Sequence, residues 1–123
     1  MRDDDPVMIV SAEEAAARPV DVVTMRRTCE VGLRWVPDHD LELLHDQLLG
    51  HVRELVIAVE RLLLGARGES ALLMQLCLQR ARTVLNEEPG TTVHVQAAHV
   101  YDLATVCRPL LSLCEKAQAA QRR

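Results

Sequence analysis

Residues 40–64, DLELLHDQLLGHVRELVIAVERLLL, decide the fold, because they carry the longest helical pattern in the chain. Apolar residues recur there every three or four positions, which is the spacing of one face of an α-helix. That stripe consists of Leu41, Leu44, Leu48, Val52, Leu55, Val59 and Leu62. The following GARG at 65–68 predicts a turn that ends the helix, since glycine accepts positive φ.

Three other segments show the same periodicity and predict helices near 22–35, 70–86 and 92–117. The residues expected to cap the four helices at their N-termini are Asp21, Asp40, Ser70 and Thr91 or Thr92. The inward positions expected in the third helix are Leu73, Leu76, Cys77, Val84 and Leu85. Pro109 falls inside the last helix, where the missing N–H predicts a bend or a loosened turn.

Short connections between these segments predict an all-α, up-and-down antiparallel four-helix bundle over residues 20–118. Residues 1–19 are expected to add a short extra helix that starts at Ser11, and 119–123 to form a charged tail. Gly50 interrupts the second helix at a cost of about 1 kcal/mol relative to alanine. It therefore predicts a close helix crossing, or a ring such as Trp35 lying over it.

Composition excludes several classes of protein. The chain has 123 residues, of which 49% are hydrophobic and 26% charged, so it forms one ordered domain. A net charge of −4 argues against nucleic acid as a partner, because phosphate binding needs a basic face. No apolar run approaches the roughly 20 residues of a membrane helix, and residues 1–6 lack a signal-peptide pattern. A cytoplasmic protein that binds no membrane is expected.

Motifs for catalysis or metal binding are missing. Glu42-x-x-His45 has the spacing of a di-iron ligand pair, but such sites need a second copy of the motif and two further carboxylates. Cys107 and Cys114 lie too far apart for a structural zinc pair, and no Cys-x-x-Cys occurs. We expect reduced, buried thiols, no metal and no cofactor. No catalytic residue is assigned, so an enzyme is disfavoured.

The apolar surface of the helix over 40–64 exceeds what one small bundle needs. Leu43, Leu49, Val56 and Leu63 form a second row beside the main stripe. Surplus apolar surface usually marks an association site, so this row is the candidate interface of a homodimer or of a complex with another protein. The sequence thus predicts a non-catalytic interaction protein.

A small-molecule binder or enzyme is the alternative function. Four-helix bundles can hold a ligand in an apolar pocket between their helices. The polar residues that would face such a ligand are His51, Tyr101 and Arg108.

Five short motifs occur in a fixed order over residues 20–117. They are Thr24-Met25-Arg26, Leu48-Leu49-Gly50-His51-Val52-x-x-Leu55-Val56, Ala81-Arg82-x-x-Leu85-x-x-Glu88-Pro89-Gly90, Leu103-Ala104 and Leu113-Cys114-Glu115. Together they resemble a family of small actinobacterial proteins, common in Streptomyces, that carry a domain of unknown function and are labelled natural product biosynthesis proteins. The resemblance implies a cytoplasmic helical domain, with natural product biosynthesis as its context. It supplies no catalytic residues.

Overall fold

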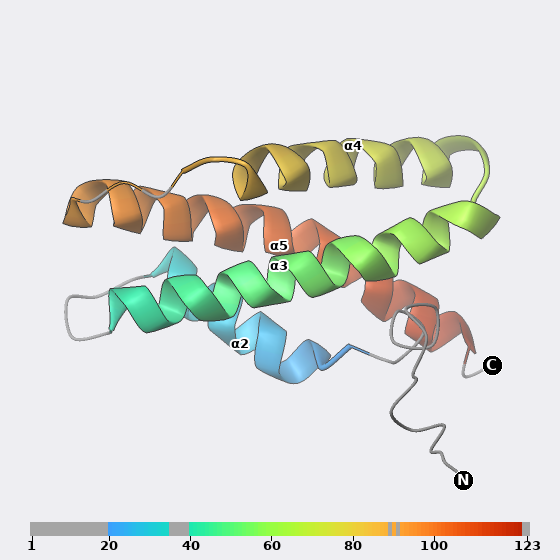
Figure 1. Cartoon of the computed structure of the whole chain (residues 1–123). Helices are drawn as coiled ribbons and strands as arrows, with labels where there is room; N and C mark the ends of the chain where they lie inside the picture. The colour runs from blue at the N-terminus through green and yellow to red at the C-terminus, as the bar shows by residue number, and fades with distance from the viewer. Residues whose placement is uncertain (1–19, 35–39, 89, 91, 122–123) are drawn as a thin grey trace, which may run out of the picture.

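The computed structural model describes residues 20–34, 40–88, 90 and 92–121, and the described residues form helices with no strand (Figure 1). The four helices are α2 (Val22–Leu33), α3 (Leu41–Gly65), α4 (Gly68–Leu85) and α5 (Val93–Gln121). The all-α prediction is confirmed, and α5 continues four residues beyond the end predicted at Ala117. The short helix predicted near Ser11 lies outside the described residues.

Local hydrogen bonds explain where the helices begin. The Asp21 carboxylate accepts from Thr24 N at 3.1 Å, and the Asp40 carboxylate accepts from Leu43 N at 3.1 Å. Thr92 Oγ1 accepts from Val95 N at 3.2 Å at the start of α5. These three predicted caps are confirmed. The third helix begins at Gly68, whose φ of +64° suits glycine, and not at Ser70.

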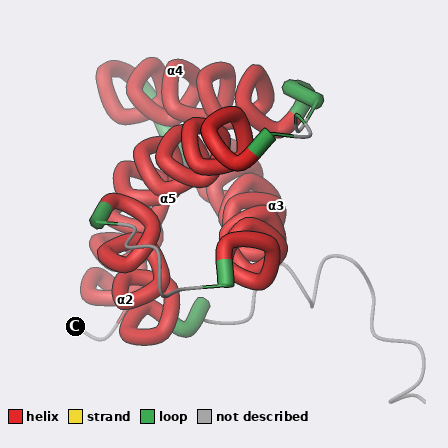
Figure 2. Tube along the Cα trace, turned by 90° about the vertical axis from the view of Figure 1, so that its left-hand side faces the viewer, coloured by secondary structure: helices red, strands yellow, loops and turns green. Residues whose placement is uncertain are grey.

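The helices are arranged in layers (Figure 2). The pair α3 and α5 lies in the middle, with α4 packed on one side of the pair and α2 on the other. Within the described residues α5 contacts all three other helices, whereas α2 and α4 do not contact each other. The core residues with the largest fully buried side chains are Leu48, Leu55, Leu78, Leu103, Leu110 and Leu111. Because α4 is covered from one side only, its far side faces solvent.

The close helix crossing lies at Gly32, and the close crossing expected at Gly50 is wrong. Gly50 is exposed, and a methyl group added there would meet no atom within 4 Å. At Gly32 the same methyl would lie 2.9 Å from Leu48 Cδ1 and 3.1 Å from Ala104 Cβ. Gly32 therefore lets α2 approach both α3 and α5. Trp35, the ring proposed to cover Gly50, lies outside the described residues.

The inward face predicted for α4 is wrong in part. Leu78 and Ala81 are buried, while Leu73 and Leu76 are each 52% exposed. The remaining expected residues, Cys77, Val84 and Leu85, pack partly buried against the core. Apolar residues occupy both sides of this helix, so periodicity alone does not select the side that faces the core.

The apolar row on α3 does not form one exposed stripe. Leu43 is 54% exposed, Val56 is 9% exposed, and Leu49 and Leu63 are half-buried against the core. The step of six residues from Leu43 to Leu49 rotates the side chain about 120° around the helix, which takes Leu43 off the shared face. The predicted row is thus mostly packed against the core, whereas the exposed apolar residues of α3 are Leu43, Ile57 and Leu64.

Pro109 lies within α5, which continues past it to Gln121. The proline is exposed and has no N–H to donate to the carbonyl of Thr105. The bend that it is expected to cause stays a prediction. None of the described helices is both long enough and apolar enough to pass through a bilayer.

Candidate functional site

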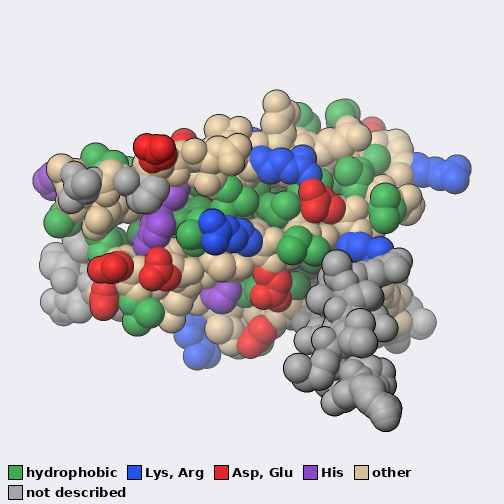
Figure 3. All heavy atoms as spheres, in the orientation of Figure 1, with side chains coloured by type: hydrophobic (Ala, Val, Ile, Leu, Met, Phe, Trp, Pro, Cys, Tyr) green, Lys and Arg blue, Asp and Glu red, His purple; other side chains and the backbone are tan. Residues whose placement is uncertain are grey.

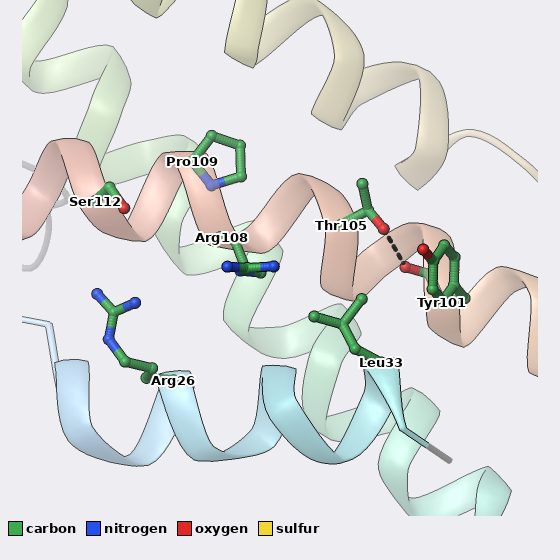
Figure 4. Close-up of a pocket in the computed structure, with 7 residues that line it drawn as sticks. All are labelled: Arg26, Leu33, Tyr101, Thr105, Arg108, Pro109 and Ser112. Carbon is green, nitrogen blue, oxygen red and sulfur yellow. Dashed lines mark hydrogen bonds between the residues drawn. The ribbon is translucent and has the colours of Figure 1, made fainter.

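Two of the three polar residues predicted to face a ligand come together. Tyr101 and Arg108 line a hollow of about 400 Å³ between α2 and α5, shared with Arg26 and Ser112 (Figure 4). His51 does not take part in it. Its half-buried ring lies near the charges of Glu54 and Asp21, and burial lowers its pKa below the ordinary value of 6.5.

The hollow gathers hydrogen-bond donors. Arg26 extends from α2 and Arg108 from α5 into the same space, as Figure 4 shows. The Arg26 guanidinium is already paired, because its Nη2 donates to Glu115 Oε1 at 2.7 Å. The Thr105 hydroxyl is also engaged in a hydrogen bond within the helix, since its Oγ1 donates to the carbonyl of Tyr101 at 2.8 Å. Arg108 and the hydroxyls of Tyr101 and Ser112 are therefore the groups available to an anion.

A second depression is mainly apolar. It is a groove of about 380 Å³ between α4 and α5, lined by Leu73, Leu76, Cys77, Gln79, Arg80, Thr105, Val106 and Pro109. Three neighbouring leucines of α4 lie at or beside it. Leu72 is 58% exposed, and Leu73 and Leu76 are each 52% exposed. Figure 3 shows apolar side chains reaching the surface among charged ones on the face that carries α3 and α4.

A pair of histidines joins three helical segments, and the sequence reasoning missed it. His45 Nε2 lies 2.7 Å from His99 Nδ1, and His99 Nε2 lies 3.0 Å from the carbonyl of Val84 at the end of α4. A carbonyl can only accept, so His99 Nε2 carries a proton, and in the neutral ring His99 Nδ1 then accepts from His45 Nε2. His45 Nδ1 lies 3.7 Å from Asp46 Oδ1.

The burial and the hydrogen bonds of the histidine pair fit a role in holding helices together. The side chains of His99 and His45 are 6% and 14% exposed, and the hydrogen bonds between them and to Val84 use three of the four ring nitrogens. One signal pointed to His99: it lies four residues before Leu103, in phase with the second apolar stripe of the last helix. The described residues hold no group of three or more His, Cys, Asp or Glu side chains arranged for a metal ion.

The cysteines offer no exposed thiolate. All four are free, and the thiols of Cys29 and Cys107 interact with each other between α2 and α5. This interaction lowers the pKa of Cys29, whereas the interaction together with burial raises the pKa of Cys107. Burial raises the pKa of Cys114 to about 11. Cys29 is only 1% exposed, so its lowered pKa does not make it an accessible nucleophile.

Comparison with known proteins places the chain by family alone. No curated protein and no solved structure resembles it closely enough to count as a match. One family model does match, over residues 23–119, which span α2 to α5 almost completely. The chain therefore belongs to a family of unknown function, DUF6415.

Proposed function

We propose that the chain is a non-catalytic helical interaction protein whose docking surface is the outer side of α4 together with the groove beside α5. One observation carries the proposal: Leu72, Leu73 and Leu76 are adjacent on α4 and each is more than half exposed. Single exposed leucines are ordinary, but a contiguous group beside an apolar groove is typical of an interaction surface.

The packing of α4 supports this role. Only Leu78 and Ala81 of its 18 residues are fully buried, while three leucines of the same helix are more than half exposed. The groove extends the apolar surface of the exposed leucines to α5, where the buried side chain of Val106 lines it. A helix from a partner would cover both.

The biological setting is part of the proposal. The resemblance to actinobacterial natural product biosynthesis proteins suggests an accessory role in such a pathway, in the cytoplasm. In that setting the partner is a second copy of the chain or a protein of the same pathway. The chain itself would catalyse no reaction, in keeping with the buried thiols and with the histidines that are hydrogen-bonded within the protein.

Site-directed photo-crosslinking tests the docking surface. A photoreactive phenylalanine analogue replaces Leu72 on α4 or, as a control, the exposed Arg53 on α3 in cells that produce the protein. We expect adducts from position 72, identified by mass spectrometry, and no such adducts from position 53. Equal adducts from both positions, or none from position 72, would contradict the proposal.

Binding of a small anionic ligand is a second candidate function, favoured by the hollow between α2 and α5. Arg108 would make the main charged contact, because Arg26 already binds Glu115. A carboxylate or a phosphate suits this donor set, since arginine binds both through paired hydrogen bonds.

Inorganic phosphate and acetate are suitable probes of the hollow. We expect saturable NMR shifts at Tyr101 and Ser112 on titration. Arg108→Gln should weaken binding about tenfold or more, because a charged hydrogen bond contributes about 1.5–3 kcal/mol. Arg53→Gln is the matched control and should bind as the unmodified chain does. Non-saturable shifts, or equal affinity in Arg108→Gln, would exclude this function.

A further inference from the structure

Four residues form a line along an exposed side of α4. Glu69, Leu73, Leu76 and Arg80 are spaced 4-3-4, and at about 100° per residue each lies within roughly 40° of the point opposite the buried Leu78. All four are exposed. We call them the outer line of α4.

The outer line reads symmetrically in both directions. From either end it runs charged residue, leucine, leucine, charged residue, and the two end charges are opposite in sign. Its midpoint lies between Met74 and Gln75. A twofold axis through that midpoint brings Glu69 of one copy opposite Arg80 of the other, and Leu73 opposite Leu76. Two such ion pairs and two such leucine contacts form at once.

We propose that a second copy of this chain covers the outer line, with the two α4 helices packed antiparallel about this axis. The proposal rests on the docking surface proposed above and names its occupant. The neighbouring positions also match: the same axis brings Ser70 opposite Gln79, two polar residues, and Leu72 opposite Cys77.

The charges select the antiparallel arrangement. Parallel helices in the same register would bring Glu69 next to Glu69 and Arg80 next to Arg80, which is repulsive at both ends. Neither residue forms an ion pair with another residue in the part of the chain that the structure describes. Glu60 and Arg82, by contrast, already pair with each other across α3 and α4. Within the described residues, no other charge therefore competes with a second copy for the end charges of the outer line.

The size of the surface predicts a weak dimer. An 18-residue helix is about 27 Å long, so two paired helices alone bury less area than the roughly 800 Å² per partner of a standard interface. The groove adds to this area, because Leu73, Leu76 and Arg80 line its edge. We expect a dissociation constant in the micromolar range.

Charge reversal tests both the partner and the register. Glu69→Arg and Arg80→Glu, each alone, bring like charges together twice in the dimer. Sedimentation equilibrium should show each variant associating about tenfold or more weakly than the unmodified chain. An equimolar mixture of the two should associate about as tightly as the unmodified chain, because every cross-pair is then opposite in charge. The double variant should also regain its self-association.

Controls separate association from folding. Circular dichroism should show unchanged helicity in both variants, since both side chains are exposed. Arg53→Glu on α3 should leave the dimer intact. A chain that stays monomeric at hundreds of micromolar, single variants that dimerise normally, or a mixture that fails to recover would each overturn the proposal. A monomer whose position 72 crosslinks to a different protein would overturn the self-pairing alone and leave the docking surface standing.

Discussion

Two glycine-to-alanine substitutions should change stability in opposite directions. Gly32 and Gly50 both lie within helices, so alanine improves the helical propensity at each by up to about 1 kcal/mol. At Gly50 nothing lies within 4 Å of the added methyl, and the whole gain should be kept. We expect Gly50→Ala to raise the free energy of unfolding by about 0.5–1 kcal/mol.

At Gly32 the added methyl collides with the core. Leu48 Cδ1 would lie 2.9 Å away and Ala104 Cβ 3.1 Å away. Leu48 is fully buried and has little room to rotate, and Ala104 moves only with the backbone of α5. Overpacking of this kind costs about 1–3 kcal/mol. After subtraction of the small propensity gain near the end of α2, Gly32→Ala should lower the free energy of unfolding by about 1–2 kcal/mol.

Urea unfolding followed by far-ultraviolet circular dichroism measures both changes. All proteins must be compared at one concentration, because self-association would add to apparent stability. The transition midpoint should fall for Gly32→Ala and rise for Gly50→Ala, with similar slopes. A Gly32→Ala variant as stable as the unmodified chain would show that α2 does not approach α3 and α5 as closely as described.

Other substitutions test the histidines and thiols. His99→Leu should lower the free energy of unfolding by about 1–3 kcal/mol, because it leaves the partly buried His45 ring without its hydrogen-bond partner. The loss should be smaller when His45 is also replaced by leucine. Equal losses in the single and double variants would contradict the hydrogen bond. His51 has a folded-state pKa below its ordinary value of 6.5, so the stability that it contributes is present above pH 6.5 and is lost as pH falls below it. Urea unfolding at pH 7.5 and 5.5 should therefore show a smaller drop for His51→Gln than for the unmodified chain, and an equal drop would exclude this cause. Iodoacetamide should modify the half-buried Cys77 first, and the three buried thiols should react only after unfolding. Peptide mass spectrometry identifies the labelled positions. Rapid labelling of all four cysteines would contradict the burial of the other three.

Local features of the sequence predicted the helices well. Caps depend on residues a few positions apart, so Asp21, Asp40 and Thr92 could be identified without knowledge of the fold. The continuous stripe on α3 required burial of one face, and Leu44, Leu48, Val52, Leu55 and Val59 are indeed buried. Periodicity was sufficient to identify the face of α3 that is most deeply buried.

Contacts between distant residues could not be predicted in this way. His45 and His99 are separated by 54 positions, and neither histidine has a local motif that indicates the other. Gly32 and Gly50 look alike in the sequence, and only the crossing of α2 with α3 and α5 shows which of them needs to be small. The sequence identifies Tyr101 and Arg108 only as polar residues of the last helix, whereas the hollow that they share depends on how α2 packs beside them.

The layered arrangement explains why α4 has an uncovered apolar side. Since α5 packs against every other helix and α3 lies beside it, the middle pair is covered by both outer helices. The outer helices cannot cover each other, because the middle pair separates them. An exposed apolar side on such a helix promotes nonspecific association unless neighbouring charges limit which surfaces can bind to it. Glu69 and Arg80 lie at the two ends of the pair of leucines and impose that limit. The pattern therefore favours one specific pairing of helices over nonspecific association.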